Sequence, residues 1–359
     1  MKILVINCGS SSIKYKLFKF PKKRLISKGL IEKIGEADSP IQTHSQGVKL
    51  IFERLISEKI VKDIHEISVI GHRVVHGGET FKKPIVIDER VIEKIKECSM
   101  LAPLHNPANL AGILGCKEML PKIKQIAVFD TAYHQTILEH VYLYAIPMEY
   151  YRKYGVRKYG FHGTSHQFVA EHAAQILKKP LNKLKIITCH LGNGCSITAI
   201  DKGRVVDTSM GFTPLEGLIM GTRSGDIDVA AVFYIMEKEK ISITHMDEIL
   251  NRKSGLLGVS GISNDVRTLK EKAKKGNEAA KVALSMFMYR IKKYIGAYYL
   301  ILGGADAICF TAGIGENNPD IINEFRKDIR KIAKNQTKVL VVSTDEELMI
   351  ATLSYALVK

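Results

Sequence analysis

Two Gly-containing turns carry the kinds of side chain that bind phosphate. In the first, the apolar stretch Ile3–Ile6 runs into Asn7, Gly9 and three serines, and the chain returns as a strand-like stretch that includes Lys14. Glycine lets backbone N–H groups approach an oxyanion closely, hydroxyls donate hydrogen bonds, and a lysine adds a point charge. The amide oxygen of Asn7 suits a hydrated hard cation. An ordinary hairpin turn has the same composition, so this segment alone leaves both interpretations open.

The second turn repeats this pattern later in the chain. The segments ILVINCGSSSIKYKLF and IITCHLGNGCSITAID both run from an apolar strand through a polar turn with glycine into a second strand. Two such segments, each followed by further sheet and helix, indicate a duplicated domain with a cleft between the copies. Their identity is low, so the repeat alone is weak support.

Further segments place arginine, histidine and carboxylate side chains beside glycines, several of them at the end of an apolar strand. Open α/β sheets bind ligands at that edge. Taken singly, each cluster has an ordinary structural explanation, such as a buried arginine paired with a carboxylate. Together they supply what phosphoryl transfer needs: anion-binding turns, arginines, histidine donors and carboxylates for a metal. The segments are GHRVVHGGETF (71–81), APLHNPANL (102–110), AVFDTAYHQT (127–136), KYGFHGTSHQFVA (158–170), HLGNGCS (190–196), TSMGFTPLEGLIMGTRSGDID (208–228) and FTAGIGENN (310–318).

The elements that must position these residues follow from the apolar periodicity. We expect an α/β fold in which each half has a mixed five-stranded sheet covered by helices. Strands are expected at 2–6, 13–18, 67–70, 125–129, 185–190, 195–200, 307–311 and 338–342. Helices are expected at 47–58, 89–98, 107–119, 165–178, 226–238, 246–251, 265–274, 276–302 and 319–333.

Bulk properties limit the class of protein. A chain of 359 residues with 46% hydrophobic residues is long enough for two domains with real cores. Six scattered cysteines without a CxxC pair are typical of a reducing cytosol, and Lys2 is followed by too short an apolar run for a signal peptide. No apolar run reaches the roughly 18 residues of a membrane span. We therefore expect a cytoplasmic protein without a membrane partner.

The net charge of +16, from 53 Lys and Arg against 37 Asp and Glu, indicates an anionic partner or a solvated lysine-rich surface. The basic residues are spread widely, and no nucleic-acid-binding motif accompanies them. We expect no nucleic-acid partner. Steeply salt-dependent retention on DNA would contradict that expectation.

Taken in order, the motifs identify a family resemblance from Met1 to about Ala351. NCGSSSIKYKLF, GHRVVHGGE, PLHNPANL, FDTAYHQT, YGFHGTSH, HLGNGCSI, MGFTPLEGLIMGTRSGDID, AGIGEN and TDEELMIA occur in the order found in the acetate kinases. The chain resembles that family, within the sugar kinase, Hsp70 and actin superfamily. The resemblance implies duplicated actin-like ATPase (ribonuclease H-like) domains with a central cleft and a homodimer. It also implies an acid-substrate domain over 1–131 plus 346–359 and a nucleotide-binding domain over 132–345.

The resemblance also implies roles for individual residues. The catalytic residues would be Arg73, Asp130, His162 and Arg223. The acid would meet Arg73, Val75, Leu104, His105, Phe161 and Pro214. ATP or ADP would meet Ser10, Ser12, Lys14, His190, Leu191, Gly192, Asn193, Gly194, Asp265, Val266, Arg267, Gly313, Ile314, Gly315, Glu316 and Asn317. Asn7 and Glu346 would hold Mg²⁺, with Mn²⁺ as an alternative. A helix-capping carboxylate is the other interpretation of Glu346, since Thr344 to Glu347 resembles a capping sequence.

The implied reaction is ATP + acetate ⇌ ADP + acetyl phosphate by direct in-line transfer. Acetate is ionised at pH 7 and needs no general base, so we favour Asp130 as an anchor for an arginine or for metal-bound water. Propionate or butyrate is the alternative substrate, although Val75 narrows the methyl pocket more than alanine would and favours acetate. A non-enzymatic ATP-binding switch is a further alternative, which Arg73 and His162 argue against.

Two features depart from the family pattern. Ile322 stands where the family usually has an arginine after GIGEN, and the chain is shorter than is usual, with gaps before GHRVVHGGE and between Phe325 and Val339.

Overall fold

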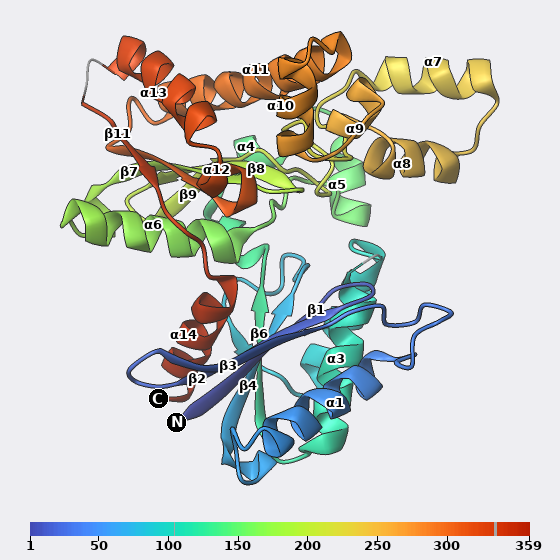
Figure 1. Cartoon of the computed structure of the whole chain (residues 1–359), viewed down its shortest axis with the longest axis vertical. Coiled ribbons are helices and arrows are strands. Elements are labelled where there is room, and N and C mark those ends of the chain that lie inside the picture. The colour runs from blue at the N-terminus through green and yellow to red at the C-terminus, as the bar shows by residue number, and fades with distance from the viewer. Residues whose placement is uncertain (104, 334–335) are drawn as a thin grey trace. The chain divides into compact units, whose positions relative to one another are not determined.

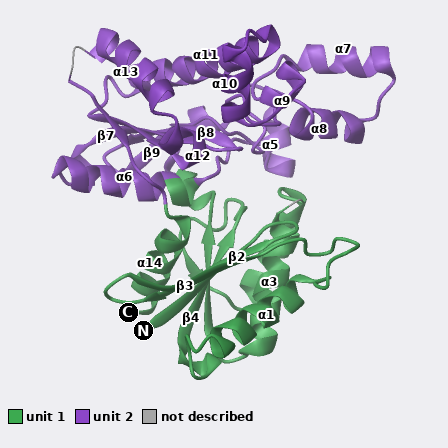
Figure 2. Cartoon of the chain, in the orientation of Figure 1, with its two compact units in different colours: residues 1–135, 163–165, 345–359 green, residues 136–162, 166–344 purple. Residues whose placement is uncertain are grey.

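Strand β1 (Lys2–Cys8) is a central strand of the first sheet because its apolar residues are buried on both faces. The computed structural model describes residues 1–103, 105–333 and 336–359, so Leu104 lies outside the described residues (Figure 1). It forms two compact units (Figure 2). Unit 1 contains Met1–Gln135, Gly163–Ser165 and Asp345–Lys359, and unit 2 contains Thr136–His162 and His166–Thr344.

Unit 1 is built on a mixed six-stranded sheet of order β3-β2-β1-β4-β6-β5. Strand β1 is antiparallel to β2 and parallel to β4, and β4 is parallel to β6. The carboxyl ends of β1, β4 and β6 therefore meet at one edge, and Asn7 pairs with Lys14 across the β1–β2 ladder. The other strands of this sheet are β2 (Ile13–Lys19), β3 (Arg24–Ile31), β4 (Ile67–Val74), β5 (Ile85–Val86) and β6 (Lys124–Phe129).

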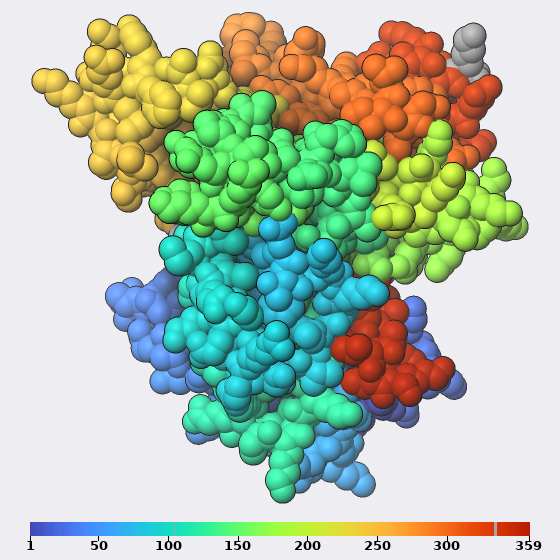
Figure 3. Space-filling view, turned by 180° about the vertical axis from the view of Figure 1, so that it is seen from behind, coloured from blue at the N-terminus to red at the C-terminus, as the bar shows by residue number. Residues whose placement is uncertain are grey.

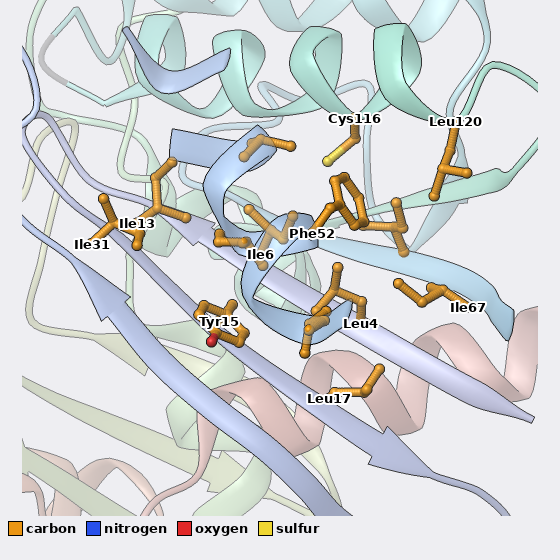
Figure 4. Packing of buried hydrophobic residues seen from close by; sticks show 14 of the residues in the cluster. Leu4, Ile6, Ile13, Tyr15, Leu17, Ile31, Phe52, Ile67, Cys116 and Leu120 are labelled. Carbon is orange, nitrogen blue, oxygen red and sulfur yellow. The ribbon is translucent and has the colours of Figure 1, made fainter. Parts of the chain in front are cut away.

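Helices cover both faces of this sheet because side chains alternate along β1. Leu4 and Ile6 face a core that includes Phe52 and Cys116 of the helices on one side (Figure 4). Ile3 and Val5 face the C-terminal helix on the other side, which Figure 3 shows in red against the N-terminal strands. The helices of unit 1 are α1 (His44–Ser57), α2 (Glu89–Glu97), α3 (Asn106–Met119) and α14 (Glu346–Val358).

Unit 2 has a mixed five-stranded sheet of order β11-β10-β7-β8-β9. Figure 1 shows α6 on one face of it and α11 and α13 on the other. Its strands are β7 (Lys185–Leu191), β8 (Cys195–Asp201), β9 (Arg204–Thr208), β10 (Ala307–Thr311) and β11 (Lys338–Val341). Its helices are α4 (Glu139–Tyr142), α5 (Met148–Tyr154), α6 (Gly163–Leu177), α7 (Val229–Glu239), α8 (Ile243–Arg252), α9 (Gly255–Ser260), α10 (Val266–Lys274), α11 (Glu278–Ile301), α12 (Ala312–Asn317) and α13 (Pro319–Ala333).

Short 3₁₀ helices complete the secondary structure. They cover Ile64–Glu66, Cys98–Met100, Ala132–Thr136 and Leu181–Lys183. Among the residues that the structure describes, no helix is both long enough and apolar enough to cross a membrane. The cysteines described are all free thiols.

The mixed α/β fold and every predicted strand and helix are confirmed, most of them with shifted ends. Three details were wrong. The first sheet has six strands because the two-residue strand β5 adds to β6. Gly313–Asn317 lies in a short helix, α12, which was not among the predicted elements. Helix α7 begins at Val229 with Asp228 as its N-cap, so Asp226 belongs to the preceding loop.

Candidate functional site

Arg73 and Asp130 form an ion pair at the carboxyl edge of the sheet in unit 1. Nε of Arg73 donates to Oδ2 of Asp130 at 3.0 Å, and Oγ1 of Thr164 donates to Oδ1 at 2.9 Å. The strands β4 and β6 run parallel and end side by side, which brings the two residues together. Burial alone would lower the pKa of Arg73, but the charges of Asp130 and Glu346 outweigh it and raise that pKa. The guanidinium is therefore a fixed cation at this edge.

Asn7 and Glu346 complete a polar cluster around the same guanidinium. Nη1 of Arg73 lies 3.4 Å from Oδ1 of Asn7, and its Nε lies 4.0 Å from Oε2 of Glu346. Burial raises the pKa of Glu346 to about 6, because the opposing effect of Arg73 is smaller and Asp130 adds to the shift. The N-cap of α14 is Asp345, whose Oδ1 accepts from the backbone N–H of Leu348 at 2.8 Å. Helix capping therefore does not explain Glu346.

The donor set of this cluster fits a hard divalent cation. Asp130 and Glu346 offer carboxylate oxygens and Asn7 offers an amide oxygen, and Mg²⁺ prefers oxygen ligands. Among the described residues, no group of three or more His, Cys, Asp or Glu side chains is arranged to hold a metal by itself. Mg²⁺ commonly uses one or two carboxylates together with waters and substrate phosphates, so a partial set of this kind is compatible with it.

Lys14 lies beside this cluster on β2 and is paired with Glu347. Nζ of Lys14 lies 2.9 Å from Oε1 of Glu347, and Nζ of Lys16 lies 3.1 Å from the other oxygen. Burial would raise the pKa of Glu347, but the two lysines hold it below its usual value. Ser10 is exposed and Ser12 is half-buried in the neighbouring β1–β2 turn. Glu347 was missed from the sequence, although two lysines on one face of a strand were a signal for a buried acid.

Buried asparagines hold the backbone where the acid pocket was predicted. Oδ1 of Asn109 accepts from the N–H of Val75, and Oδ1 of Asn106 accepts from the N–H of His76, both at 3.0 Å. Val75 is buried, and His105 is the residue before α3. Both asparagines were missed as site residues, although the Asn-Pro-Ala-Asn sequence between two apolar stretches was available as a signal.

Unit 2 contains a cavity of about 420 Å³, within the size range of small-molecule sites. Several residues predicted to bind nucleotide line it, whereas His190, Leu191, Gly194, Gly315 and Glu316 do not. Asn264 and Asn318 line it too and were missed from the sequence. The lining residues are Gly192, Asn193, Asn264, Asp265, Val266, Arg267, Gly313, Ile314, Asn317 and Asn318. Ser10, Ser12 and Lys14, also predicted to bind nucleotide, belong to unit 1.

Local hydrogen bonds shape the walls of this cavity. Asp265 caps α10 and pairs with Arg267, whose Nη2 lies 2.8 Å from Oδ2 of Asp265. Oε1 of Glu316 accepts from the N–H of Ala312 at 2.8 Å and from that of Thr344 at 3.3 Å. Glu316 therefore fixes the start of α12, which accounts for its absence from the cavity wall.

His162 and Arg223 lie beside the turn between β7 and β8 in unit 2. The ring of His162 stacks on that of His190 with centroids 4.2 Å apart, and its Nδ1 lies 2.9 Å from Oγ of Ser196. A side chain at Gly194 would meet the His162 ring at 3.4 Å and Nη1 of Arg223 at 3.5 Å. Glycine at this position leaves space bordered by the His162 ring and the Arg223 guanidinium, which suits an oxyanion.

Arg223 is held differently from Arg73. Its Nη1 donates to the carbonyl of Pro214 at 3.3 Å, and no carboxylate within the described part of the chain pairs with it. Burial lowers the pKa of Arg223. Arginine side chains nevertheless stay charged in proteins. Phe161 is buried next to His162 in sequence. A partly desolvated guanidinium without a carboxylate partner is suited to binding an anionic ligand.

A model of the acetokinase family matches residues 2–333. The chain belongs to this family. An acetate kinase from Halothermothrix orenii is 51% identical over an alignment of 389 positions that covers 98% of each chain. Another acetate kinase, from Treponema denticola, is 49% identical over 397 positions that cover all of both chains. Since this alignment is longer than the 359 residues here, the chain lacks segments that this acetokinase has.

Solved structures of acetokinases share the fold. The crystal structure of Porphyromonas gingivalis acetate kinase matches with a TM-score of 0.94 and 43% identity over all of both chains. A propionate kinase from Francisella tularensis matches with a TM-score of 0.93 and 40% identity over 99% of each chain. A ROK hexokinase from Thermus thermophilus, at 12% identity and a TM-score of 0.50, shows a likeness of fold alone. The predicted family and the actin-like kinase fold are thus confirmed.

Proposed function

We propose that this acetokinase catalyses ATP + acetate ⇌ ADP + acetyl phosphate. The observation that carries the proposal is the 51% identity to an acetate kinase along almost the whole chain. We assign acid binding to unit 1 and nucleotide binding to the cavity of unit 2, which takes ATP or ADP. Asn264 and Asn318 join the predicted nucleotide-binding residues, since both line that cavity.

The main chemical obstacle is repulsion between an anionic carboxylate and an anionic phosphoryl group. The carboxylate is already ionised at neutral pH, so no base is required. Arg73, Arg223 and His162 would neutralise charge that concentrates in the transition state. Asp130 serves as the anchor of Arg73, and its hydrogen bonds to Arg73 and Thr164 support this role.

We further propose that Asn7 and Glu346 hold Mg²⁺ together with the nucleotide. When bound, the ion would neutralise phosphate charge and orient the transferring group. Lys14, with Ser10 and Ser12, remains the proposed contact of unit 1 to phosphate, and Glu347 keeps the lysine in place through their ion pair.

The proposal is tested by acetate-dependent release of ADP from MgATP by the purified chain. We expect ADP at a rate that saturates with acetate and falls to background without it. A non-enzymatic ATP-binding switch would bind ATP without acetate-dependent turnover. Acetate-independent hydrolysis as the main activity would contradict a kinase.

Propionate is the second candidate substrate because a propionate kinase from Francisella tularensis shares the fold closely. Val75 is the proposed selector, since it is buried where the family resemblance places the methyl pocket. A hydrophobic pocket separates one methylene by only about 10–200-fold, so activity toward both acids is expected, with acetate preferred.

Val75→Ala is expected to shift the ratio of kcat/KM for acetate and propionate toward propionate by a factor on the order of ten. The removed methyl groups leave room for one more carbon in the acid. The ratio is measured with both acids at matched concentrations, and Val74→Ala, at the neighbouring last position of β4, is the control. An unchanged ratio in Val75→Ala would make Val75 an ordinary core residue.

We also propose that the chain is a homodimer that works in the cytoplasm without nucleic acid. Exposed apolar side chains gather on α7 and the loop before it, and α7 and α8 form the yellow lobe of unit 2 in Figure 3. Contiguous apolar patches on a surface mark interaction sites. The exposed residues are Ile227, Val229, Phe233, Tyr234 and Ile235. The six free cysteines support a reducing compartment.

Phe233→Ser is expected to convert the dimer to a species of half its mass in light scattering. Phe233 is 63% exposed, so the change should cost the folded monomer little. Ile176→Ser on α6 is the matched control, because Ile176 is 54% exposed on another helix of unit 2. A wild-type chain that is monomeric at micromolar concentration, or an unaltered Phe233→Ser dimer, would contradict the assignment of this face.

A further inference from the structure

Residues 217–226 form a loop that carries Arg223. The carboxylate of Asp226 joins the two ends of this loop at Gly217, and this contact is called the neck of the loop. Oδ1 of Asp226 accepts from the N–H of Gly217 at 2.7 Å, and the N–H of Asp226 donates to the carbonyl of Gly217 at 3.0 Å. The two backbone segments at this neck approach so closely that a side chain at Gly225 would lie 2.4 Å from the carbonyl of Leu218. The neck is therefore a specific contact between residues nine positions apart.

Two side chains of helix α11 contact the same neck. The hydroxyl of Tyr294 donates to Oδ2 of Asp226 at 2.8 Å, and Nη1 of Arg290 lies 3.3 Å from that oxygen. Nη1 of Arg290 also donates to the carbonyl of Gly217 at 3.0 Å. Burial and the charge of Asp226 raise the pKa of Tyr294, so its hydroxyl remains a donor. Both carboxylate oxygens of Asp226 are thus used, and both ends of the neck are tied to α11.

The tip of the loop is fixed by backbone hydrogen bonds. The N–H of Met220 donates to the carbonyl of Arg223 at 3.1 Å, and the N–H of Ser224 donates to that of Leu250 at 3.1 Å. Among the described residues, the side chain of Arg223 makes weak polar contacts only to the Pro214 carbonyl and the sulfur of Met220. The position of the guanidinium therefore depends on the backbone of the loop, and the neck sets that backbone.

We propose that Asp226, through Tyr294 and Arg290, is the positioning residue for Arg223. This inference rests on the proposed function, in which Arg223 stabilises the transferring phosphoryl group. In the part of the chain that the structure describes, Asp226 neither hydrogen-bonds to Arg223 nor lines the nucleotide cavity. Its side chain is 42% exposed, so burial of the residue does not explain its network. A shift of the guanidinium by a fraction of an ångström is enough to lose transition-state stabilisation.

The test is a double-mutant cycle between Asp226→Asn and Arg223→Ala. Asparagine keeps the shape, but an NH₂ group replaces one of the two carboxylate oxygens. One of the donors at Oδ1 and Oδ2 therefore loses its acceptor, and the negative charge that pairs with Arg290 is removed. Asp226→Asn is expected to lower kcat about tenfold or more in the wild-type background and less than twofold when Arg223 is already alanine. Tyr294→Phe should cause a smaller loss in the same direction.

Asp228→Asn is the matched control, because Asp228 lies two residues away and caps α7 through the N–H of Ala230. It is expected to leave kcat within about twofold. Hydrogen exchange supplies a second readout that does not depend on activity: Asp226→Asn should speed exchange of the Gly217 and Asp226 amides, and Asp228→Asn should affect only α7. An inactive wild-type chain would refute the proposed function. The exchange result would still show whether Asp226 stabilises the neck. Equal losses from Asp226→Asn with and without Arg223, or unchanged exchange at the neck, would overturn the inference.

Discussion

Arg223→Ala is expected to lower kcat by at least about 100-fold, the scale of losing one transition-state donor. The melting temperature should stay close to that of the wild type. The substitution leaves no carboxylate of the described structure unpaired, and it removes a guanidinium charge that burial already disfavours. Arg223→Lys should restore little activity, since a point charge does not replace the planar fork of arginine. Arg252→Ala, an exposed position at the end of α8, is the control. Steady-state kinetics and thermal melts on the same preparations measure both effects.

Arg73→Ala should cause a similar loss of kcat together with a clear loss of stability. Removing the guanidinium leaves Asp130, which is 1% exposed, as a buried carboxylate without its cation. Breaking one side of a buried ion pair costs about 3–5 kcal/mol. Arg90→Ala on α2 controls for the loss of an exposed arginine in unit 1. Turnover near the wild-type rate in both Arg73→Ala and Arg223→Ala would refute the arginine clamp.

Glu346→Gln is expected to raise the Mg²⁺ concentration for half-maximal rate about tenfold or more and to lower kcat. Burial raises the pKa of Glu346 to about 6, so at neutral pH this carboxylate is ionised at a site that disfavours its charge. Since the folded-state pKa is above the ordinary value, protonation stabilises the fold as the pH falls through 6, and stability is lost as the pH rises through 6. A bound cation would offset the loss of stability that the ionised carboxylate of Glu346 causes. Glu346→Gln should therefore leave the melting temperature unchanged or slightly raised above pH 6.

The pH profile gives this prediction a direct readout. At low Mg²⁺ the wild-type rate should fall as the pH drops through about 6. Added Mg²⁺ should shift this fall in rate to lower pH, because the ion binds the ionised carboxylate of Glu346. Asp345→Asn is the neighbouring control: loss of this N-cap should cost about 1 kcal/mol of stability and leave the Mg²⁺ dependence alone. A lowered melting temperature with wild-type Mg²⁺ dependence in Glu346→Gln would overturn the assignment.

The fold was predictable where apolar periodicity is strong. Strands β1, β7 and β10 are buried along nearly their whole length and were found from their apolar runs. Strand β3 was missed because its side chains are mostly exposed, with a polar sequence that resembles a loop. Helix α14 was not predicted because its residues are apolar on most sides, and that pattern does not distinguish helix from strand.

The candidate site was predictable only in part. The edge residues Asn7, Arg73 and Asp130 follow from strand ends, since parallel strands bring their carboxyl ends together. The partners that set their chemistry depend on tertiary contacts: Glu347 reaches Lys14 from the far end of the chain. Asp226 was expected at the start of a helix and proves to close a loop, a contact that no local pattern indicates. Ile322, which replaces the usual arginine, is 1% exposed, so this position serves the core.

The most direct test of the central proposal is trapping of the acyl phosphate with hydroxylamine. The purified chain is incubated with MgATP and acetate, propionate or butyrate at matched concentrations, and the acyl hydroxamate is measured. We predict hydroxamate that depends on both ATP and acid, with acetate giving the highest rate, propionate a lower one and butyrate the lowest. ATP consumption without hydroxamate from any of the three acids would contradict phosphoryl transfer to a carboxylate.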